Sequence, residues 1–403
     1  MMKLDTIKKV ISNGYCLGCG LCCVIDNNTK IIEKDGALIS EYHNSNNGHI
    51  SVCPAAGYDI IGIGKNIHSA SYYSYEIGWY NELKLAQSCD DTVIKKASSG
   101  GAMTTIALFM LEKGYADGVI CTRYSLEQSF PRPVSYIART KSDLLQAQGS
   151  KYCPTSVLAT IKELKAEEKY VLIGTPCQIA GWQKYKEEYK PSINIVLTIA
   201  NFCGGYRDYR EIDYFVHKVA GFNKATYFQH RGDGVPGFMR IIDDNGTEWK
   251  YPYPDYAKLS PFRKNKRCVY CIDATGELAD ISCGDAWIER IKKTKEPWSS
   301  LILRNEKAVS LLNQMVNDSY LSVGEVSITE LIQSQKLNIS SKKYRQFKRI
   351  RITSIFWGYA PNWYNCIKDF GGSYVGEFKI LVSKFIKESI LKLHINKVYD
   401  KLH

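Results

Sequence analysis

Four cysteines fall within eight positions of the stretch YCLGCGLCCV, a density typical of a metal or iron–sulfur site. Cys16, Cys19 and Cys22 are separated by two residues each, the spacing with which ferredoxin-like loops hold three corners of a [4Fe–4S] cluster. A Cys-Pro pair typically supplies a further thiolate in ferredoxins, and Cys53 is followed by a proline here. The sequence therefore predicts one cluster, held by Cys16, Cys19, Cys22 and Cys53.

A structural zinc ion is the alternative interpretation of this segment, because four thiolates also satisfy a tetrahedral ion. Zinc sites usually pair two Cys-x-x-Cys sequences, whereas three cysteines at this spacing favour iron. Cys23 directly follows Cys22, and neighbouring side chains diverge, so we expect Cys23 to be a spare thiol.

A second group of cysteines follows strand-like stretches in the middle of the chain. Cys177 follows VLIGTP, at the predicted N-terminus of a helix whose dipole would stabilise a thiolate, and Cys203 follows IVLTIANF. Cys268 and Cys271 form a Cys-x-x-Cys pair. Because α/β proteins bind ligands at the carboxyl ends of their strands, these four thiols form a candidate second site, although ordinary buried cysteines explain the spacing as well. The basic residues that would offset the charge of such a site are Lys264, Lys266 and Arg267.

The elements that would position these cysteines alternate along the chain. Val- and Ile-rich stretches predict buried strands at 117–123, 133–139, 169–175 and 193–199, and helical patterns lie between them at 102–114 and 156–168. This alternation predicts an α/β body, α+β overall, between an N-terminal ferredoxin-like segment and a helical basic tail. The expected divisions are 1–70, 80–165, 166–330 and 331–403.

Charge and cysteine content restrict the compartment and the partners. The formal net charge is +12, and residues 331–403 contain 14 Lys or Arg against 4 Asp or Glu. A basic tail on a near-neutral body favours an acidic partner or a membrane surface over nucleic acid, with a solvated helical face as the plain alternative. The predicted helix at 377–395 places apolar side chains on one face, namely Phe378, Leu381, Val382, Phe385, Ile386 and Ile390. We see no signal peptide or membrane span, and so expect a cytoplasmic protein with reduced thiols.

Six stretches, in order, resemble the beta subunit of coenzyme F420-reducing hydrogenase and its relatives, which include formate dehydrogenase beta chains and 7-hydroxymethyl chlorophyll a reductase. They are CLGCGLC, KASSGGAMTTIALFMLEKGYADGVI, GSKYCPTS, VLIGTPCQIAGW, FCGG and CVYCIDATGELADISCGDAW. The resemblance implies FAD and [4Fe–4S] clusters, and it strengthens the prediction of a second cluster held by Cys177, Cys203, Cys268 and Cys271.

The resemblance also implies the residues of a flavin site. Paired glycines before an apolar helix expose backbone N–H groups that suit a pyrophosphate or a flavin edge, although an ordinary helix cap explains them equally well. The expected flavin neighbours are Ser98, Ser99, Gly100, Gly101, Gly149, Ser150, Lys151 and Tyr152. Lys151 would stabilise an anionic reduced flavin, His230 is a candidate proton donor or a structural residue, and Arg231 is a candidate anion clamp. Asp280 and Asp285 are expected to be structural, and the role of Cys283 is open.

Three hypotheses of function follow. The first is a reductase that passes electrons from an acidic, ferredoxin-like donor through two clusters to FAD and, as a hydride, to an organic small molecule. The second is an electron-transfer beta subunit of a larger complex that reduces or oxidises a deazaflavin such as F420. The third is a non-catalytic, zinc-stabilised interaction protein. Homo-oligomer formation, the substrate and the direction of electron flow are open.

Overall fold

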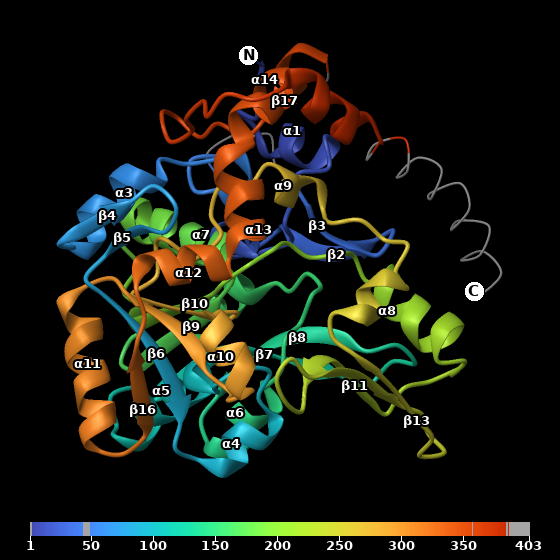
Figure 1. Cartoon of the computed structure of the whole chain (residues 1–403). Helices are drawn as coiled ribbons and strands as arrows, with labels where there is room; N and C mark the ends of the chain where they lie inside the picture. Colours follow the sequence, from blue (N-terminus) through green and yellow to red (C-terminus); the bar gives the residue numbers. More distant parts are fainter. Residues whose placement is uncertain (1, 43–48, 357, 384–385, 387–403) are drawn as a thin grey trace.

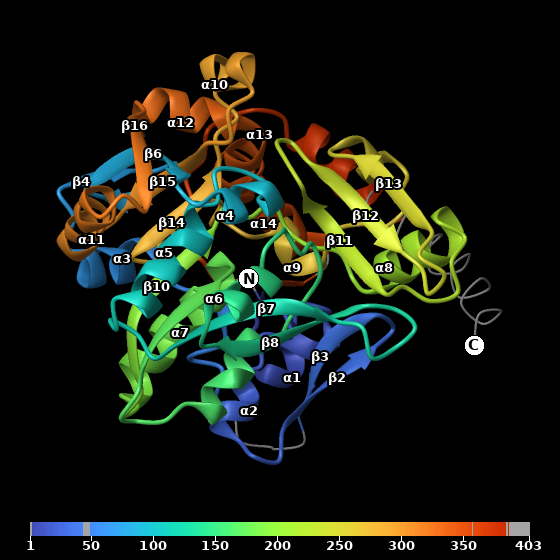
Figure 2. The ribbon, with the colours of Figure 1, turned by 90° about the horizontal axis from the view of Figure 1, so that it is seen from below.

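The computed structural model describes residues 2–42, 49–356, 358–383 and 386. Its centre is an eight-stranded mixed sheet with the order β16-β6-β15-β14-β10-β9-β7-β8 (Figures 1 and 2). The strands are β6 (Glu82–Ser88), β7 (Gly118–Ser125), β8 (Arg132–Ala138), β9 (Lys169–Gly174), β10 (Asn194–Asn201), β14 (Ile281–Asp285), β15 (Ser299–Leu303) and β16 (Leu321–Glu325). The four strands β7, β9, β10 and β14 are parallel, so their carboxyl ends share one edge.

The four predicted strands are confirmed as β7, β8, β9 and β10. The helix predicted at 102–114 is confirmed as α5 (Ala102–Glu112), but 157–163 forms a 3-10 helix, η3 (Val157–Glu163), in place of the α-helix predicted over 156–168. Contacts with the N-terminal cysteine loop explain the difference. Leu158 N donates to Cys19 O (2.9 Å) and Ser156 Oγ donates to Gly18 O (2.9 Å). The start of this segment is therefore fixed by the neighbouring loop instead of by an α-helical ladder.

Helices cover the two faces of the sheet. The apolar side chains of α5 and α11 (Glu306–Asn317) share one cluster with β7, β10 and β15. The long helix α7 (Pro176–Tyr189) packs in a different cluster, with β9 and the N-terminal segment. A separate antiparallel sheet of β11 (Tyr227–Gly232), β12 (Phe238–Ile242) and β13 (Glu248–Pro252) lies beside the large one (Figure 2).

The N-terminal segment contains α1 (Ile7–Ser12), α2 (Leu21–Ile25), the hairpin β2 (Lys30–Lys34) and β3 (Ala37–Glu41), and α3 (Ile60–His68). It shares one hydrophobic cluster with the body and the C-terminal segment, to which Tyr15, Leu172 and Trp363 all contribute. β1 (Met2–Lys3) pairs in parallel with β17 (Tyr359–Ala360), and Figure 1 shows β17 and α14 (Gln346–Phe356) beside α1. The two ends of the described chain are therefore packed together. The predicted domain divisions stay predictions. The boundary at 165/166 lies between strands that belong to the same large sheet.

The basic stretch at 342–349 is largely buried, so the alternative of a solvated basic face is wrong for these residues. It lies in the turn η6 (Ser340–Tyr344) and in α14. Buried ammonium and guanidinium groups require negative partners, and three acidic side chains supply them. The ion pairs are Lys343–Glu277 (2.5 Å), Lys348–Asp369 (2.9 Å) and Arg349–Glu377 (3.0 Å). These charges fix the segment to the body, so they do not form a surface for an acidic partner or a membrane.

The start of the predicted C-terminal helix is also attached to the body. Residues 374–383 are helical, Leu381 is fully buried, and Phe378 packs against the shared cluster. Ile386 is exposed, while Phe385 and Ile390 lie outside the described residues. No described helix is both long enough and apolar enough to cross a membrane.

We expect Gly57→Ala to lower the free energy of unfolding sharply, because Gly57 lies where the two ends of the described chain meet. Its φ is +99°, and an added Cβ would lie 1.9 Å from Asn362 O. The expected loss, measured by urea denaturation, exceeds about 3 kcal/mol. Gly114→Ala is the matched control, since Gly114 also has positive φ (+66°) but faces open space, and it should cost about 1 kcal/mol. Equal losses in the two variants would contradict the close packing.

Candidate redox site

A cavity of about 510 Å³ lies at the shared carboxyl edge of the parallel strands. Its walls include Cys121 of β7, Gly174 of β9, Asn201 of β10 and Asp285 of β14. This is the edge at which open α/β sheets bind ligands, because loops that follow parallel strands diverge there and leave a crevice. The cavity is therefore the candidate functional site.

Most of the predicted flavin neighbours line this cavity, although they come from distant parts of the chain. They are Ser98, Ser99, Gly101, Gly149, Ser150, Lys151 and Tyr152, and Arg231, the candidate anion clamp, also lines the cavity. The loops that carry them are in contact: Ser98 Oγ lies 3.4 Å from Ser150 Oγ, and Ser150 N donates to Arg231 O (3.0 Å). Gly100 is not among the lining residues, because its Cα is pressed against β6 and β15, where a Cβ would lie 2.4 Å from Ala86 O.

Arg231 joins the walls of the cavity. Its guanidinium forms an ion pair with Asp285 (2.6 Å) and donates to Ser98 O (2.6 Å) and Pro236 O (2.6 Å). Burial opposes its charge, but Asp285 and Tyr152 favour it, and the pKa of Arg231 is raised above its usual value. These three acceptors belong to different segments of the chain, and Arg231 joins them through its guanidinium. Arg231 therefore shapes the cavity. Asp285, expected to be structural, is its partner.

Two helix N-termini point their positive dipole ends at the cavity. Gly101 precedes α5 with φ +71° and offers no side-chain cap, so the first N–H groups of α5 are uncapped beside the lining residues Ala102, Met103 and Thr104. The first turn of α7 also contributes Cys177 and Gln178 to the lining, but Thr175 and Gln178 form a capping box there, so the free N–H groups are those of α5. Such N–H groups bind anions well, so this end of the cavity suits a phosphate or an anionic ring edge.

Two aromatic side chains that were not predicted from the sequence form part of the cavity wall. Tyr253 and Trp287 both line the cavity, and their rings are nearly parallel, at 6.3 Å and 11°. The Arg231 guanidinium lies over both rings, 4.4 Å from the Tyr253 centroid and 5.2 Å from that of Trp287. Trp287 is the last residue of the stretch CVYCIDATGELADISCGDAW, and that stretch was the one signal in the sequence that could have pointed to it. Tyr253, with no motif, could not be found in advance. Flat aromatic surfaces favour planar ring ligands.

Lys151 lines the cavity, but its ammonium group donates hydrogen bonds to backbone carbonyls. Nζ donates to Ala147 O, Gln148 O (3.0 Å) and Gly149 O (3.0 Å), at the end of α6 (Lys141–Gln146). Burial lowers the pKa of Lys151 to about 8, opposed weakly by Cys121 and Cys153. Its role as a flavin partner therefore stays a prediction.

His230 is not among the lining residues and lies behind them. It is fully buried and is surrounded by the rings of Tyr124, Tyr152 and Phe228. Its Nδ1 is hydrogen bonded to the Tyr124 hydroxyl, and Nε2 has no hydrogen-bond partner among the described residues. Burial lowers its pKa to about 3. The ring is thus neutral near pH 7, and a proton-donor role stays a prediction that this position does not favour.

The four N-terminal cysteines lie near one another, and their role as cluster ligands stays a prediction. Cys19 interacts electrostatically with Cys22, Cys53 and Cys16, and Cys22 with Cys53 and Cys16. The loop turns at Gly18 and Gly20, where an added Cβ would lie 2.4 Å from Leu38 and 2.6 Å from Ala159. Among the described residues, no three His, Cys, Asp or Glu side chains form a group that could hold one metal ion.

The second set of cysteines also lies close together, and two of its members line the cavity. Cys177 and Cys203 line it, and Cys177 interacts with Cys203, Cys268 and Cys271. Burial, with Cys203, raises the pKa of Cys177 to about 12. The prediction that the helix dipole would stabilise a Cys177 thiolate is therefore wrong for the thiol without a bound metal. The cost of desolvating the thiolate outweighs the effect of the dipole. Buried thiols of this kind release their protons when they bind a metal.

The basic residues around this set have different roles from those expected. Lys266 Nζ donates to Asn13 O (3.0 Å), and Arg267 donates to Ala55 O and Pro54 O (2.8 Å each), so both attach the N-terminal segment. Lys264 interacts with Cys203 and Cys268, as expected. Lys342, which was not predicted from the sequence, also reaches this set, and its Nζ lies 3.4 Å from Cys271 Sγ.

One tyrosine lies between the two cysteine sets. Tyr206 interacts electrostatically with Cys16 and Cys19 of the first and with Cys177 and Cys268 of the second. Its hydroxyl donates to Leu17 O (3.3 Å). The first set, the second set and the cavity are therefore consecutive neighbours within one packed region.

The fold and these features define an α/β ligand-binding body with two cysteine sites beside one cavity, and comparison with known proteins places it more closely. Residues 84–162 match the family model "Coenzyme F420 hydrogenase/dehydrogenase, beta subunit N-term", and residues 167–328 match the corresponding C terminus model. The chain belongs to the coenzyme F420 hydrogenase/dehydrogenase beta subunit family.

Individual relatives agree with this assignment. The chain is 27% identical over 280 residues to the coenzyme F420 hydrogenase subunit beta of Methanococcus voltae, covering 66% of this chain and 92% of the relative. It is 22% identical over 373 residues to the coenzyme F420-dependent sulfite reductase of Methanocaldococcus jannaschii, covering 87% and 54%. A chain of the F420-reducing [NiFe] hydrogenase complex from Methanosarcina barkeri has the same fold, with a TM-score of 0.55, 20% identity and coverage of 71% and 96%.

We expect the stability difference between the wild type and Lys151→Met to depend on pH. The folded-state pKa of Lys151 is about 8, below its usual value, so between about pH 8 and 10.4 the unfolded state binds more protons. The wild type should therefore gain stability relative to the variant as the pH rises through this window, by roughly 3 kcal/mol in total. Urea denaturation of both proteins across this pH range measures the difference in stability. Titrating groups that the two proteins share contribute equally to both and do not affect the difference. A constant difference would contradict the burial of this ammonium.

Proposed function

We propose that the chain is an electron-transfer subunit of an oxidoreductase that exchanges electrons with a deazaflavin of the F420 type. The observation that carries the proposal is the continuity of the site: two members of a four-cysteine set, Cys177 and Cys203, line a cavity that is also lined by the start of α5 and by the rings of Tyr253 and Trp287. The names of the relatives support F420 as the carrier.

The two cysteine sets would each hold a [4Fe–4S] cluster. Each set brings four thiols close enough to interact with one another, and the tight turns at Gly18 and Gly20 give the first loop the compact backbone that wraps a cluster. The N-terminal set would accept or deliver electrons first, and the set formed by Cys177, Cys203, Cys268 and Cys271 would face the cavity. Tyr206 would hold the two loops in register through its contact with Leu17.

The cavity would hold FAD. Its residues fit this group, since the uncapped start of α5 suits the pyrophosphate and the wall of Tyr253 and Trp287 suits a planar ring. A bound flavin would exchange single electrons with the cysteine sites and a hydride with the substrate. Arg231 would keep the loops around Ser98 and Ser150 at the spacing that the ring requires, and the buried walls would exclude water.

A second candidate is a reductase that acts without partner subunits, taking electrons from a ferredoxin-like donor and reducing a small molecule. The alignment over 87% of this chain with an F420-dependent sulfite reductase favours it, because there the matching region forms part of a reductase. The two candidates differ in whether the purified chain, supplied with a low-potential donor, reduces deazaflavin or another small molecule.

We expect anaerobically purified protein to contain about eight irons and eight labile sulfides per chain, since two [4Fe–4S] clusters require them. Cys16→Ser and Cys177→Ser should each lose about four irons and keep the rest. Cys23→Ser and Cys89→Ser are the controls, because Cys23 is outside the first set and Cys89 is an exposed thiol. Iron, sulfide, zinc and flavin are assayed on one sample of each protein. Bound zinc without iron or flavin would instead establish the zinc-stabilised interaction protein.

We expect Arg231→Met to lose more than tenfold in flavin affinity, because its bonds to Asp285 and Ser98 hold two walls of the cavity together. Flavin content and the loss of visible absorbance of F420, driven by dithionite-reduced viologen, measure binding and turnover. Arg139→Met is the matched control, since its ion pair with Glu168 lies at the surface, where such pairs contribute little. Wild-type protein that binds flavin but reduces only other acceptors would favour the second candidate.

A further inference from the structure

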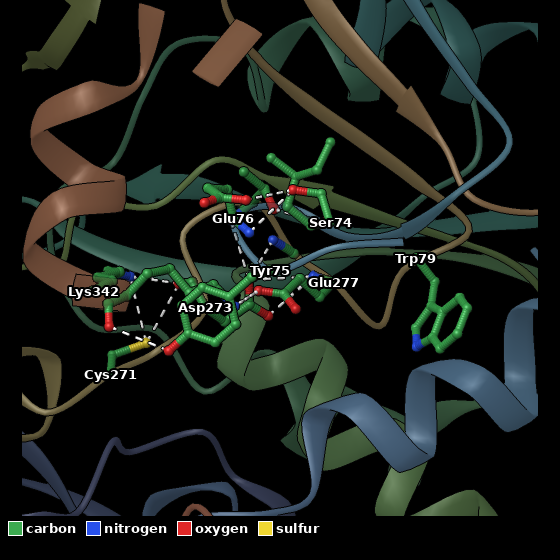
Figure 3. A network of polar contacts seen from close by, with 12 residues as sticks. Ser74, Tyr75, Glu76, Trp79, Cys271, Asp273, Glu277 and Lys342 are labelled. Atoms are coloured by element: carbon green, nitrogen blue, oxygen red, sulfur yellow. Dashed lines mark hydrogen bonds and ion pairs between the residues drawn. The ribbon is translucent and has the colours of Figure 1, made fainter. Parts of the chain in front are cut away.

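A lysine from the C-terminal segment reaches the second cysteine set. Lys342 lies in η6, beyond residues 84–162 and 167–328 that the family models match. Its side chain crosses to the loop after Cys271, where Nζ lies 3.4 Å from Cys271 Sγ and 2.7 Å from Asp273 O. Figure 3 shows Lys342 next to Cys271 and Asp273.

The charge of Lys342 is unusual in its surroundings. Only 4% of the residue is exposed, and no carboxylate of the described residues lies within ion-pair distance of its Nζ. The neighbouring Lys343 is equally buried but forms an ion pair with Glu277 at 2.5 Å. A buried ammonium without a carboxylate partner is costly. The groups that interact with Lys342 most strongly are Cys271, Cys203 and Cys268.

The position of Lys342 is fixed by the same loop that carries the cysteine. The Asp273 carboxylate accepts hydrogen bonds from the backbone N–H groups of Thr275, Gly276 and Glu277. The backbone carbonyl of Asp273 is thereby held toward Lys342 (Figure 3). The ion pair Lys343–Glu277 anchors the other end of the loop. Lys342 is thus a preorganised donor, held beside one ligand of the set.

We propose that Lys342 raises the reduction potential of the iron–sulfur group held by Cys177, Cys203, Cys268 and Cys271. It does so by donating a hydrogen bond to Cys271 Sγ and by placing a positive charge beside the set. The inference rests on the proposed function, which supplies the iron–sulfur group. One-electron reduction adds negative charge to that group, so a fixed cation and a donor to its sulfur stabilise the reduced form. Lys342 is therefore a positioning residue that acts through Cys271.

We expect Lys342→Met to lower the midpoint potential of the second group. At a fixed potential the ratio of reduced to oxidised group should fall at least tenfold, which is 59 mV for a one-electron couple. Lys342→Arg, which keeps the charge, should fall less. Lys348→Met is the matched control, since it removes an equally buried lysine of the same segment that pairs with Asp369 and contacts no cysteine, and it should leave the midpoint unchanged. Dithionite titration of the full-length protein, followed by electron paramagnetic resonance, gives the midpoints.

Iron analysis separates failure of this inference from failure of the proposed function. If Cys177→Ser removes no iron from the wild type, the second group does not exist and the proposed function fails. If the group is present and Lys342→Met leaves its midpoint unchanged, the role of Lys342 is refuted. Should Lys342→Met not fold, wild-type protein with ¹⁵N-labelled lysine replaces it. Pulsed paramagnetic resonance should then detect a nitrogen coupling to the reduced group that is absent in Lys342→Arg, and no coupling in the wild type would overturn the inference.

Discussion

The parallel alignment of β7, β9, β10 and β14 is the constraint on which the rest of the structure depends. Because the strands run in one direction, every loop that follows them begins at the same edge of the sheet. Cys177 and Cys203 follow two of these strands directly, and the uncapped N-terminus of α5 faces the same space. The apolar cluster that packs the sheet against α5 and α11 keeps this edge rigid, so residues far apart in the chain form one cavity.

Buried charge connects the C-terminal segment to this edge. Lysines and arginines that would favour solvent are held inside by Glu277, Asp369 and Glu377. Each such pair is costly to break, because the remaining charge would be buried without a partner. The segment therefore behaves as part of the body and completes the surroundings of Cys271. The N-terminal segment is held in a similar way, by Arg267 and by the apolar cluster that it shares with Trp363.

The two cysteine sets are held in position by different parts of the structure. Three cysteines of the first set lie in a short loop whose glycines give the backbone its tight turns, so the sequence spacing carries most of their geometry, and Cys53 joins them from a separate segment. The second is collected from a helix start, a strand end and a Cys-x-x-Cys turn, so the sheet carries its geometry. Tyr206 lies between them and contacts both environments. This arrangement suits electron transfer within one chain, and membership of the F420 hydrogenase/dehydrogenase beta subunit family agrees with it.

The sequence by itself determined the local features: the spacing of Cys16, Cys19 and Cys22, the four strands 117–123 to 193–199, the helix at 102–114 and the family. These depend on spacing and periodicity, which act over a few residues. Only the tertiary structure decided that Gly100 is pressed against the sheet, that His230 lies behind the cavity wall, and that Lys342 is buried beside Cys271. The contacts of Tyr253, Trp287 and Arg231 likewise join positions without a common motif. Such contacts arise from the packing of distant segments, and a single sequence does not show which segments meet.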